Sequence, residues 1–371
     1  KLTMNSKYIP FLKFKMNEVY ALNYLDDDLK VGLSVFFDLP NELPSKSHND
    51  GVNSFSPEEL LGFKTEALKK KIEAQKKYLT TKLNFLDDIF IDNYDIDPLV
   101  KIDGKTYNYK TIIDEFAPLG MIPVCGVDDR VPEHLNCVIA SAKAGVFLKD
   151  KVAIRLTESA FEDYEFIEYE FEDCLANLEA AFEKIILIFD LRVVEDIETS
   201  SKQVIDFLDN LDLGKFERII VSGSTIPKVI TELIETKKNK VIDRKEVTVF
   251  KKLKEKNVSF DYGDYTCVSP ETSFLDIYIE EIQSYMTGKV FYPYDDKLYV
   301  TRSGKTKSVI APFKPLLDEI VSKTFYRGKS YSYGDKYIFE KQPTGLKVNA
   351  SSILKPNISL HVTYMLRDFS V

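Results

Sequence analysis

Residues Lys184–Arg192, with the sequence KIILIFDLR, decide the fold class of this chain. Apolar residues run without interruption from Ile185 to Phe189 and include three isoleucines. A run this short and this rich in β-branched residues predicts a strand buried on both faces, as in a parallel sheet covered by helices. Asp190 and Arg192 then come together at the carboxyl end of the strand, which is where ligands bind in parallel α/β folds.

The same pattern recurs along the first three quarters of the 371 residues. Short apolar runs ending in charged residues alternate with helical segments, and eight such units predict a (β/α)8 TIM-like barrel. A doubly wound open sheet is the main alternative. The predicted strands are Tyr8–Lys15, Val31–Leu39, Asn84–Asp92, Met121–Val127, Lys151–Leu156, Lys184–Arg192, Arg218–Ser222 and Ser259–Val268.

Helical spacing of apolar residues fills the intervals between these strands. The clearest start is Ser56-Pro57, where a capping serine precedes proline at the first helical position. The segment Pro227–Leu253 is expected to be mostly helical, with Lys237–Lys240 on a solvated face. The other predicted helices are Asn17–Leu25, Ser56–Tyr78, Tyr107–Phe116, Pro132–Ala144, Tyr169–Phe182 and Ser201–Leu211.

The pattern changes in the last quarter of the chain. Two alternating runs in Lys289–Arg302 flank Asp295-Asp296 and predict a hairpin. We expect an amphipathic helix over Val309–Thr324, a turn-rich aromatic segment over Tyr326–Phe339, and a strand or short helix over Ile358–Leu366. Residues 1–287 are therefore predicted to form the barrel, and residues 288–371 an α+β extension packed on it.

Composition excludes several classes of protein. The net charge of −9 argues against a protein that coats nucleic acid through bulk electrostatics. No apolar stretch approaches the ~18 residues of a membrane span, and the N-terminus does not resemble a signal peptide. The four cysteines are far apart and form no CxxC pair, as expected of free thiols in a reducing cytoplasm.

Charged residues near the predicted strand ends form the chemical constellation of this sequence. In a barrel they would converge on one rim. Asp190, Asp264 and Lys13 are the catalytic candidates, and Lys15, Arg155, Arg192, Arg302 and Tyr265 are the candidates for binding substrate. Lysine and arginine suit a phosphate or carboxylate, and the carboxylates could hold a divalent cation such as Mg²⁺, although the metal stays unidentified. Asp38, Asp92 and Asp128 belong to the same set.

The alternative is that these charges pair with one another as structural ion pairs, because charged groups inside a barrel must be paired whatever the function. The three histidines have no metal-ligand spacing, so a zinc site is not expected. Replacing Asp190 with alanine separates the two interpretations. Loss of function at little cost in stability indicates a site, and a large loss of stability indicates a structural pair.

Several stretches resemble the beta-protein family, named for the beta protein of T-even phages. They are Tyr8–Lys15 with Glu18 and Ala21-Leu22, Asp190, Gly263-Asp264-Tyr265, Arg302-Ser303-Gly304, Ser332–Ile338 and His361-Val362-Thr363. The resemblance implies a phage or phage-defence setting, with a phage or host protein as a candidate partner, and no particular reaction.

Two functions follow as hypotheses. The first is a barrel enzyme, such as a phosphodiesterase-type hydrolase, acting on an anionic small molecule or nucleotide at the barrel mouth. The second is a binding protein of phage–host conflict that recognises its ligand without turnover. A neutralised mouth would favour the second hypothesis.

Overall fold

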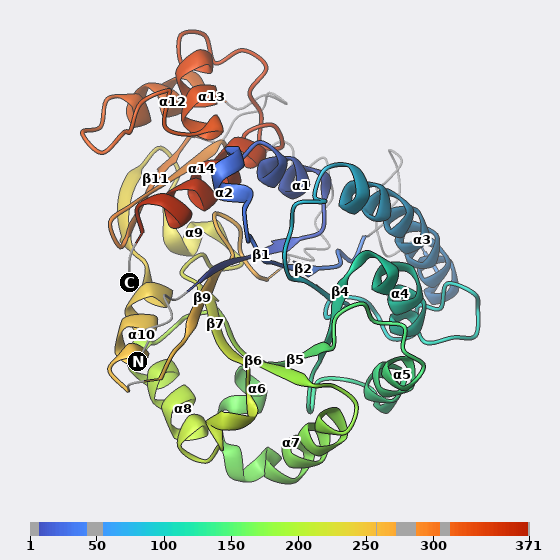
Figure 1. Ribbon diagram of the computed structural model, residues 1–371. Helices are drawn as coiled ribbons and strands as arrows, with labels where there is room; N and C mark the ends of the chain where they lie inside the picture. Colours follow the sequence, from blue (N-terminus) through green and yellow to red (C-terminus); the bar gives the residue numbers. More distant parts are fainter. Residues whose placement is uncertain (1–6, 43–54, 257, 272–286, 305–311, 370–371) are drawn as a thin grey trace.

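The computed structural model describes residues 7–42, 55–256, 258–271, 287–304 and 312–369. Eight parallel strands form a closed barrel, seen nearly end-on in Figure 1, which confirms the predicted fold and rules out the open sheet. β1 pairs with β9 as well as with β2, and this closes the ring. The barrel strands are β1 (Tyr8–Lys13), β2 (Val35–Asp38), β3 (Ile89–Asp92), β4 (Met121–Cys125), β5 (Lys151–Leu156), β6 (Lys184–Val193), β7 (Arg218–Ser224) and β9 (Asp261–Asp264).

Alternation along the strands builds two different layers inside the barrel, because successive side chains point to opposite faces. The lower layer, which lies nearer the amino ends of the strands, is apolar and includes Phe11, Phe36, Phe90 and Ile188. Two residues further on, each of these strands places a charged side chain, so the upper layer is polar. The carboxyl ends of the strands therefore carry charge into the barrel interior.

Helices surround the barrel, coloured from blue to yellow in Figure 1. The longest of them, α3, begins with a complete capping box in which Ser56 and Glu59 bind each other's backbone N–H groups, as its sequence predicts. The helices of the barrel part are α1 (Met16–Asn23), α2 (Asp27–Lys30), α3 (Pro57–Thr81), α4 (Asn108–Phe116), α5 (Pro132–Lys143), α6 (Glu158–Phe161), α7 (Tyr164–Glu179), α8 (Ile197–Asp209), α9 (Ile230–Leu233) and α10 (Lys245–Lys254). Two 3₁₀ turns, η2 (Ala117–Leu119) and η3 (Leu213–Lys215), complete this part.

The prediction that Pro227–Leu253 is mostly helical is wrong. Between the short helix α9 and α10 lies a strand, β8 (Asn239–Asp243), which pairs antiparallel with the later hairpin. Ile242 lies opposite Leu298 in this pairing. The lysine-rich run therefore forms a turn and an exposed strand rather than a helix face. The cause is a partner more than 50 residues away, which local spacing cannot reveal.

The predicted hairpin is present, as β10 (Lys289–Tyr294) and β11 (Lys297–Arg302) joined by Asp295-Asp296. Together with β8 it forms a three-stranded sheet. Three helices follow: α12 (Lys314–Val321), α13 (Tyr333–Lys341) and α14 (Leu354–Arg367). The last predicted element is thus a helix, and α13 begins inside the segment expected to be turn-rich. Residues 309–311 of the predicted amphipathic helix lie outside the described part of the chain.

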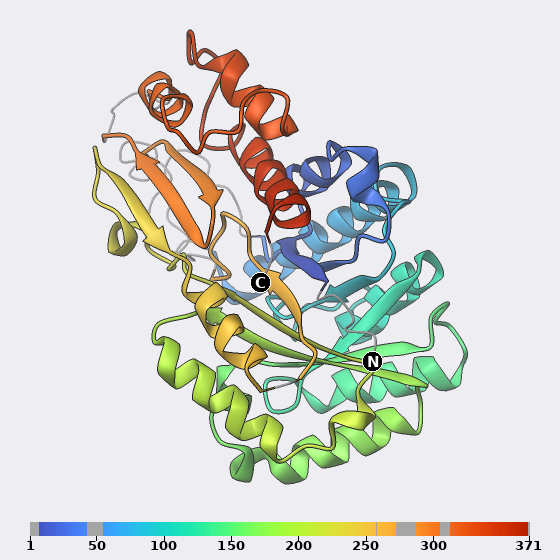
Figure 2. The same ribbon diagram turned by 60° about the vertical axis from the view of Figure 1, so that its left-hand side comes forward.

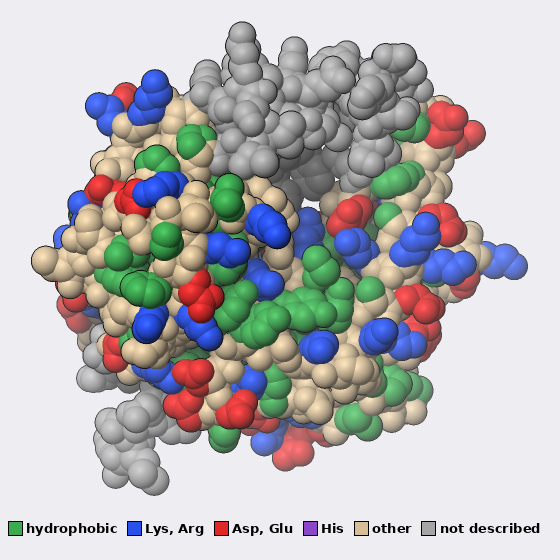
Figure 3. All heavy atoms as spheres, turned by 90° about the horizontal axis from the view of Figure 1, so that it is seen from above, with side chains coloured by type: hydrophobic (Ala, Val, Ile, Leu, Met, Phe, Trp, Pro, Cys, Tyr) green, Lys and Arg blue, Asp and Glu red, His purple; other side chains and the backbone are tan. Residues whose placement is uncertain are grey.

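The hairpin sheet and α12–α14 stand together on one side of the barrel (Figure 2). α14 packs against α1, and Figures 1 and 2 both show the two helices side by side. Tyr24 at the end of α1 stacks on Tyr333 of α13, with ring centroids 4.4 Å apart and planes 9° apart. The face seen in Figure 3 mixes hydrophobic side chains with both basic and acidic ones.

Two further predictions concern the whole chain. All four cysteines are free, and Cys125, Cys174 and Cys267 are buried, as expected. In the described ranges, we find no helix with the length and apolar character needed to cross a membrane.

Candidate functional site at the barrel mouth

Arg155 is the centre of the polar layer. Its guanidinium is fully buried and donates hydrogen bonds to carboxylates from three other strands. Nη1 lies 2.7 Å from Asp38 Oδ1 and 2.8 Å from Asp92 Oδ2, while Nε and Nη2 lie 2.9 and 2.6 Å from Asp190 Oδ2. Tyr265 joins the network, since its hydroxyl donates to Asp190 Oδ2 at 2.6 Å and accepts from Arg155 Nη2 at 3.0 Å. We call Arg155, Asp38, Asp92, Asp190 and Tyr265 the mouth network.

Two more cations border the mouth network. Lys13 Nζ lies 3.4 Å from Asp38 Oδ2 and also pairs with Asp95. Arg130 Nη2 lies 2.8 Å from Asp92 Oδ2. Among the described residues, and with Asp129 and Arg192 included, the mouth holds five carboxylates and four basic side chains, so their charges nearly cancel. The anionic members are Asp38, Asp92, Asp95, Asp129 and Asp190, and the cationic members are Lys13, Arg130, Arg155 and Arg192.

The electrostatics of the network keep Asp38 ionised and Tyr265 protonated. Burial alone would raise the pKa of Asp38, but the charges of Arg155 and Lys13 outweigh it and hold that pKa well below its usual range. Burial, followed by the neighbouring charge of Asp190, raises the pKa of the Tyr265 hydroxyl well above its ordinary value. A carboxylate held this firmly in its ionised form is a poor proton donor, because general acids need a pKa near the working pH.

Tyr94, just past the end of β3, covers the network. The guanidinium carbons of Arg155, Arg192 and Arg130 lie 4.7, 4.9 and 5.0 Å from the centroid of its ring. Contacts of this length to an aromatic ring are attractive for cations, more so where water is excluded. Sequence reasoning missed Tyr94 and Arg130, because nothing in the local pattern distinguishes them from ordinary loop residues.

Arg192 and Arg130 are the basic residues of the mouth whose hydrogen bonding is incomplete within the described residues. Arg192 Nη2 donates to the carbonyl of Pro270 at 2.9 Å, while its Nη1 is buried and has no hydrogen-bond partner in the described part of the chain. The backbone of Arg192 has φ of 54°, in the left-handed region that non-glycine residues rarely adopt. Its N–H donates to Asp190 Oδ1 at 3.0 Å, which ties this strained turn to the mouth network.

Asp129 is also incompletely hydrogen-bonded, as is Oδ1 of Asp92. Both carboxyl oxygens of Asp129 are buried without a hydrogen bond to any described residue, although Arg130 Nε lies 3.3 Å from one of them. Burial raises the pKa of Asp129, while the charge of Arg130 acts in the opposite direction. Asp128, its exposed neighbour, belongs to the predicted set, but the sequence analysis gave Asp129 no role.

Asp264 lies elsewhere. It occupies the outward face of β9, between Gly263 and Tyr265, and its Oδ2 lies 2.6 Å from Arg244 Nη2 and 2.9 Å from His361 Nε2. Burial lowers the pKa of His361, so the ring is neutral near pH 7 and donates to the carboxylate. The structure therefore brings Asp264 together with α10 and α14, behind the strand, and not with Asp190.

Lys15 and Arg302 also lie outside the mouth network. Arg302 Nε donates to Thr287 Oγ1 at 2.9 Å and Nη1 to the carbonyl of Ile234 at 2.6 Å. Lys15 precedes α1, where its charge opposes the effect of burial on Glu18. That burial raises the pKa of the Glu18 carboxyl to about 7, and its Oε2 has no hydrogen-bond partner within the described ranges.

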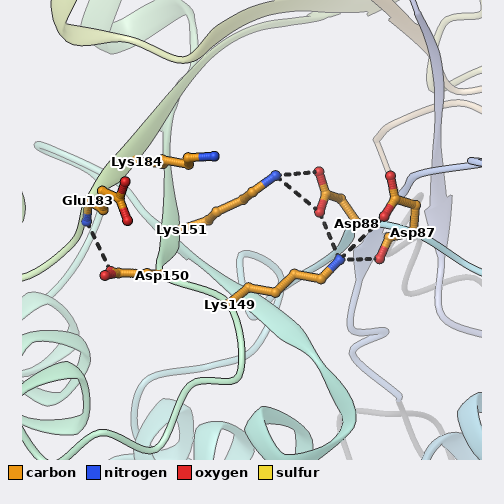
Figure 4. Close-up of a pocket in the computed structure, with 7 residues that line it drawn as sticks. All are labelled: Asp87, Asp88, Lys149, Asp150, Lys151, Glu183 and Lys184. Atoms are coloured by element: carbon orange, nitrogen blue, oxygen red, sulfur yellow. Dashed lines mark hydrogen bonds and ion pairs between the residues drawn. The ribbon is translucent and has the colours of Figure 1, made fainter.

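A second charged pocket lies at the opposite end of the barrel, near the amino ends of β3, β5 and β6 (Figure 4). Lys149 and Lys151 both reach Asp88, at 2.9 and 3.2 Å. Lysines and carboxylates alternate around this pocket, and residues at the amino ends of barrel strands serve stability in this fold. We assign this pocket a structural role.

The metal expectation finds no geometric support in the donor set. The carboxylates of Asp38, Asp92 and Asp190 all bind the guanidinium of Arg155, and they do not surround a common space that a metal ion could fill. Across the described ranges, no group of three or more His, Cys, Asp or Glu side chains is arranged as a metal site.

Comparisons with known proteins agree with the spread of the sequence resemblance. A family model described as Beta protein matches residues 8–367, nearly the whole chain. No curated protein and no solved structure matches it.

Proposed function

This chain belongs to the beta-protein family, and we propose that its barrel mouth binds a small anionic ligand through Arg192 without catalysing a reaction on it. The observation that carries the proposal is the unpaired, buried Nη1 of Arg192. A buried donor without a partner costs roughly 1–3 kcal/mol, so such groups call for an explanation in a native structure. A ligand oxygen bound at Nη1 supplies one.

The backbone at Arg192 supports the same assignment. Its left-handed conformation costs of order 1–3 kcal/mol and persists only where the surroundings enforce it, which is most often at functional sites. Here the Asp190 carboxylate accepts a hydrogen bond from the backbone N–H of Arg192. The ring of Tyr94 and the carbonyl of Pro270 contact the Arg192 guanidinium and fix its position. A guanidinium fixed in advance binds carboxylate or phosphate with little loss of entropy.

The mouth network favours binding over catalysis. Asp190, the first catalytic candidate, already accepts hydrogen bonds from Arg155 and Tyr265. Asp264, the second candidate, faces away from the mouth. Lys13 is held by two carboxylates. An enzyme would have to use Asp129, whose raised pKa suits proton transfer better than the lowered pKa of Asp38. Hydrolysis of a phosphodiester with Asp129 as general acid is therefore the second candidate function.

The biological setting is part of the proposal. The family's name supports a role in a phage–host encounter, with a phage or host protein as partner, and the four unpaired cysteines support a reducing compartment such as the cytoplasm. Expressing the protein in bacteria and measuring the efficiency of phage plating tests this setting. A plating efficiency that is the same with and without the protein across a phage panel counts against it.

Calorimetric titration with inorganic phosphate and adenosine monophosphate tests the binding site. We expect saturable binding that Arg192→Met weakens at least tenfold, while Arg367→Met, which removes a surface arginine of α14, leaves it unchanged. No saturable binding, or equal binding by the Arg192 variant, overturns the proposal. Turnover of bis(p-nitrophenyl) phosphate that is lost in Asp129→Asn would establish the enzyme instead.

A further inference from the structure

A cavity of about 250 Å³ lies where the barrel meets the extension. Its walls come from the loops after β7 and β9, the first residues of β10, and the beginning of α14. This position is at the carboxyl ends of the strands, but none of its lining residues belongs to the mouth network. The cavity is lined by Ile226, Pro227, Lys228, Ile230, Cys267, Val268, Ser269, Lys289, Phe291, Ala350, Ile353, Leu354 and Asn357.

The charged residues among the described lining of this cavity are both lysines. Lys228 and Lys289 line it, and no acidic residue is among the described residues that do. Lys289 lies directly opposite Arg302 in the hairpin register, an arrangement of like charges that destabilises a sheet. Burial, and then the charge of Arg302, lower the pKa of Lys289. An anion next to Lys289 would relieve both effects.

Asn357 provides an independent indication of a ligand. Its side chain lies on the first turns of α14, is only 3% exposed, and lines the cavity. Its Oδ1 is buried and has no hydrogen-bond partner among the residues that the structure describes. An amide can present either a donor or an acceptor after a flip of its terminal group, so Asn357 can bind an anion or the hydroxyl of a protonated acid.

The rest of the wall is apolar. Ile226, Phe291 and Leu354 present hydrocarbon to the same space, with Ile230 and Ile353 beside them. An engineered cavity of about 150 Å³ holds benzene, so the present cavity has room for roughly nine or ten non-hydrogen atoms. That size corresponds to one ring or a short chain carrying one acidic group.

We propose that this cavity binds a small organic anion, with a carboxylate or phosphate group at Lys289, Lys228 and Asn357 and an apolar body against Ile226, Phe291 and Leu354. The site is independent of the Arg192 site at the barrel mouth, so either proposal can fail without the other. Because its walls come from both the barrel and the extension, the bound anion also links these two parts of the chain.

Fluorine NMR titration of the full chain tests the proposal with 4-fluorobenzoate and its neutral analogue 4-fluorobenzamide. We expect saturable binding of the benzoate, at least tenfold weaker for the benzamide. We expect the same loss for benzoate in Lys289→Met, a variant that should fold because it removes a buried charge from beside Arg302. Phenyl phosphate in place of benzoate shows which head group is preferred.

Two controls make the result specific. Lys297→Met changes a partly exposed lysine of the same hairpin, which pairs with Asp243, and should bind benzoate as the unmodified protein does. Lys251→Met, which changes an exposed lysine of α10 that pairs with Asp296, should also leave benzoate binding unchanged. Benzoate and benzamide binding equally, no saturable binding of either, or full benzoate binding by Lys289→Met each overturns the proposal.

Discussion

Arg155 on β5 and Asp190 on β6 share two hydrogen bonds, of 2.9 and 2.6 Å, that converge on one carboxylate oxygen in the fully buried upper layer of the barrel. This relationship gives Asp190 a structural role as well as a position at the mouth. The experiment that the sequence suggested, replacement of Asp190 by alanine, now has a definite expected result in stability.

We predict that Asp190→Ala lowers the free energy of unfolding by about 3–5 kcal/mol, because it leaves Arg155 short of a partner in a buried site. Chemical denaturation monitored by circular dichroism measures this. Asp206→Ala is the matched control, since it breaks the exposed Lys202–Asp206 pair on α8 and should cost no more than about 1 kcal/mol. Equal, small losses in both variants would show that the mouth network does not hold the barrel together.

Glu18 gives the protein a specific dependence of stability on pH. Its pKa is raised by burial to about 7 in the folded protein, above the ordinary value of 4.5, so the folded state favours the protonated acid. The stabilisation is complete below pH 4.5 and is lost as the pH rises through about 7.

We therefore predict that Glu18→Gln becomes more stable relative to the unmodified protein as the pH rises from 4.5 to 7, by about 1.4 kcal/mol per pH unit. Denaturation at several pH values in this window measures the difference. Glu170→Gln, at an exposed position of α7, is the control and should give a flat difference. A flat difference for Glu18→Gln would show that its carboxyl is solvated or paired in solution.

Much of the fold could be predicted from the sequence, because each barrel strand coincides with a local apolar run that ends in a charged residue. The strand β8 could not be predicted, because Ile242 becomes part of a sheet only through Leu298, far along the chain. Register has a similar effect on the site. Asp264 and Tyr265 are adjacent in sequence, yet Asp264 faces α14 and Tyr265 faces Asp190. The register of β9 in the closed barrel determines which of the two side chains points inward.

The position of the charged layer was predictable from the sequence, but the pairing of its charges was not. Charged residues after apolar runs indicate a polar mouth, and Lys13, Arg155 and Asp190 do meet there. Which of these charged side chains form ion pairs with one another depends on distances across the barrel. The spacing of residues along the sequence does not give those distances. The unpaired groups that support our proposals, on Arg192 and Asn357, are visible only once every neighbour has been placed.

Two glycines make a matched test of the packing between α13 and α14. At Gly334 an added Cβ would lie 2.1 Å from the carbonyl oxygen of Pro356, whereas at Gly62 in α3 it would meet nothing within 4 Å. We predict that Gly334→Ala destabilises the protein by about 1–3 kcal/mol through overpacking, while Gly62→Ala stabilises it by about 0.5–1 kcal/mol through helix propensity. Thermal unfolding of both variants measures this. Similar shifts of the same sign would show that α13 and α14 are not in close contact.

Removing the extension tests whether residues 1–287 form an independent barrel. Without β11, the strand β8 loses its only pairing among the described strands, and without α14 the Asp264 carboxylate loses His361 while α1 loses the helix packed on it. An unpaired edge strand and an exposed apolar helix face both promote aggregation. We therefore predict that a chain ending at residue 287 is insoluble or unfolds without a cooperative transition, whereas the full chain unfolds in one step. Expression of the two chains followed by calorimetry decides the matter, because a soluble, cooperatively folding 1–287 fragment would establish a separate barrel domain.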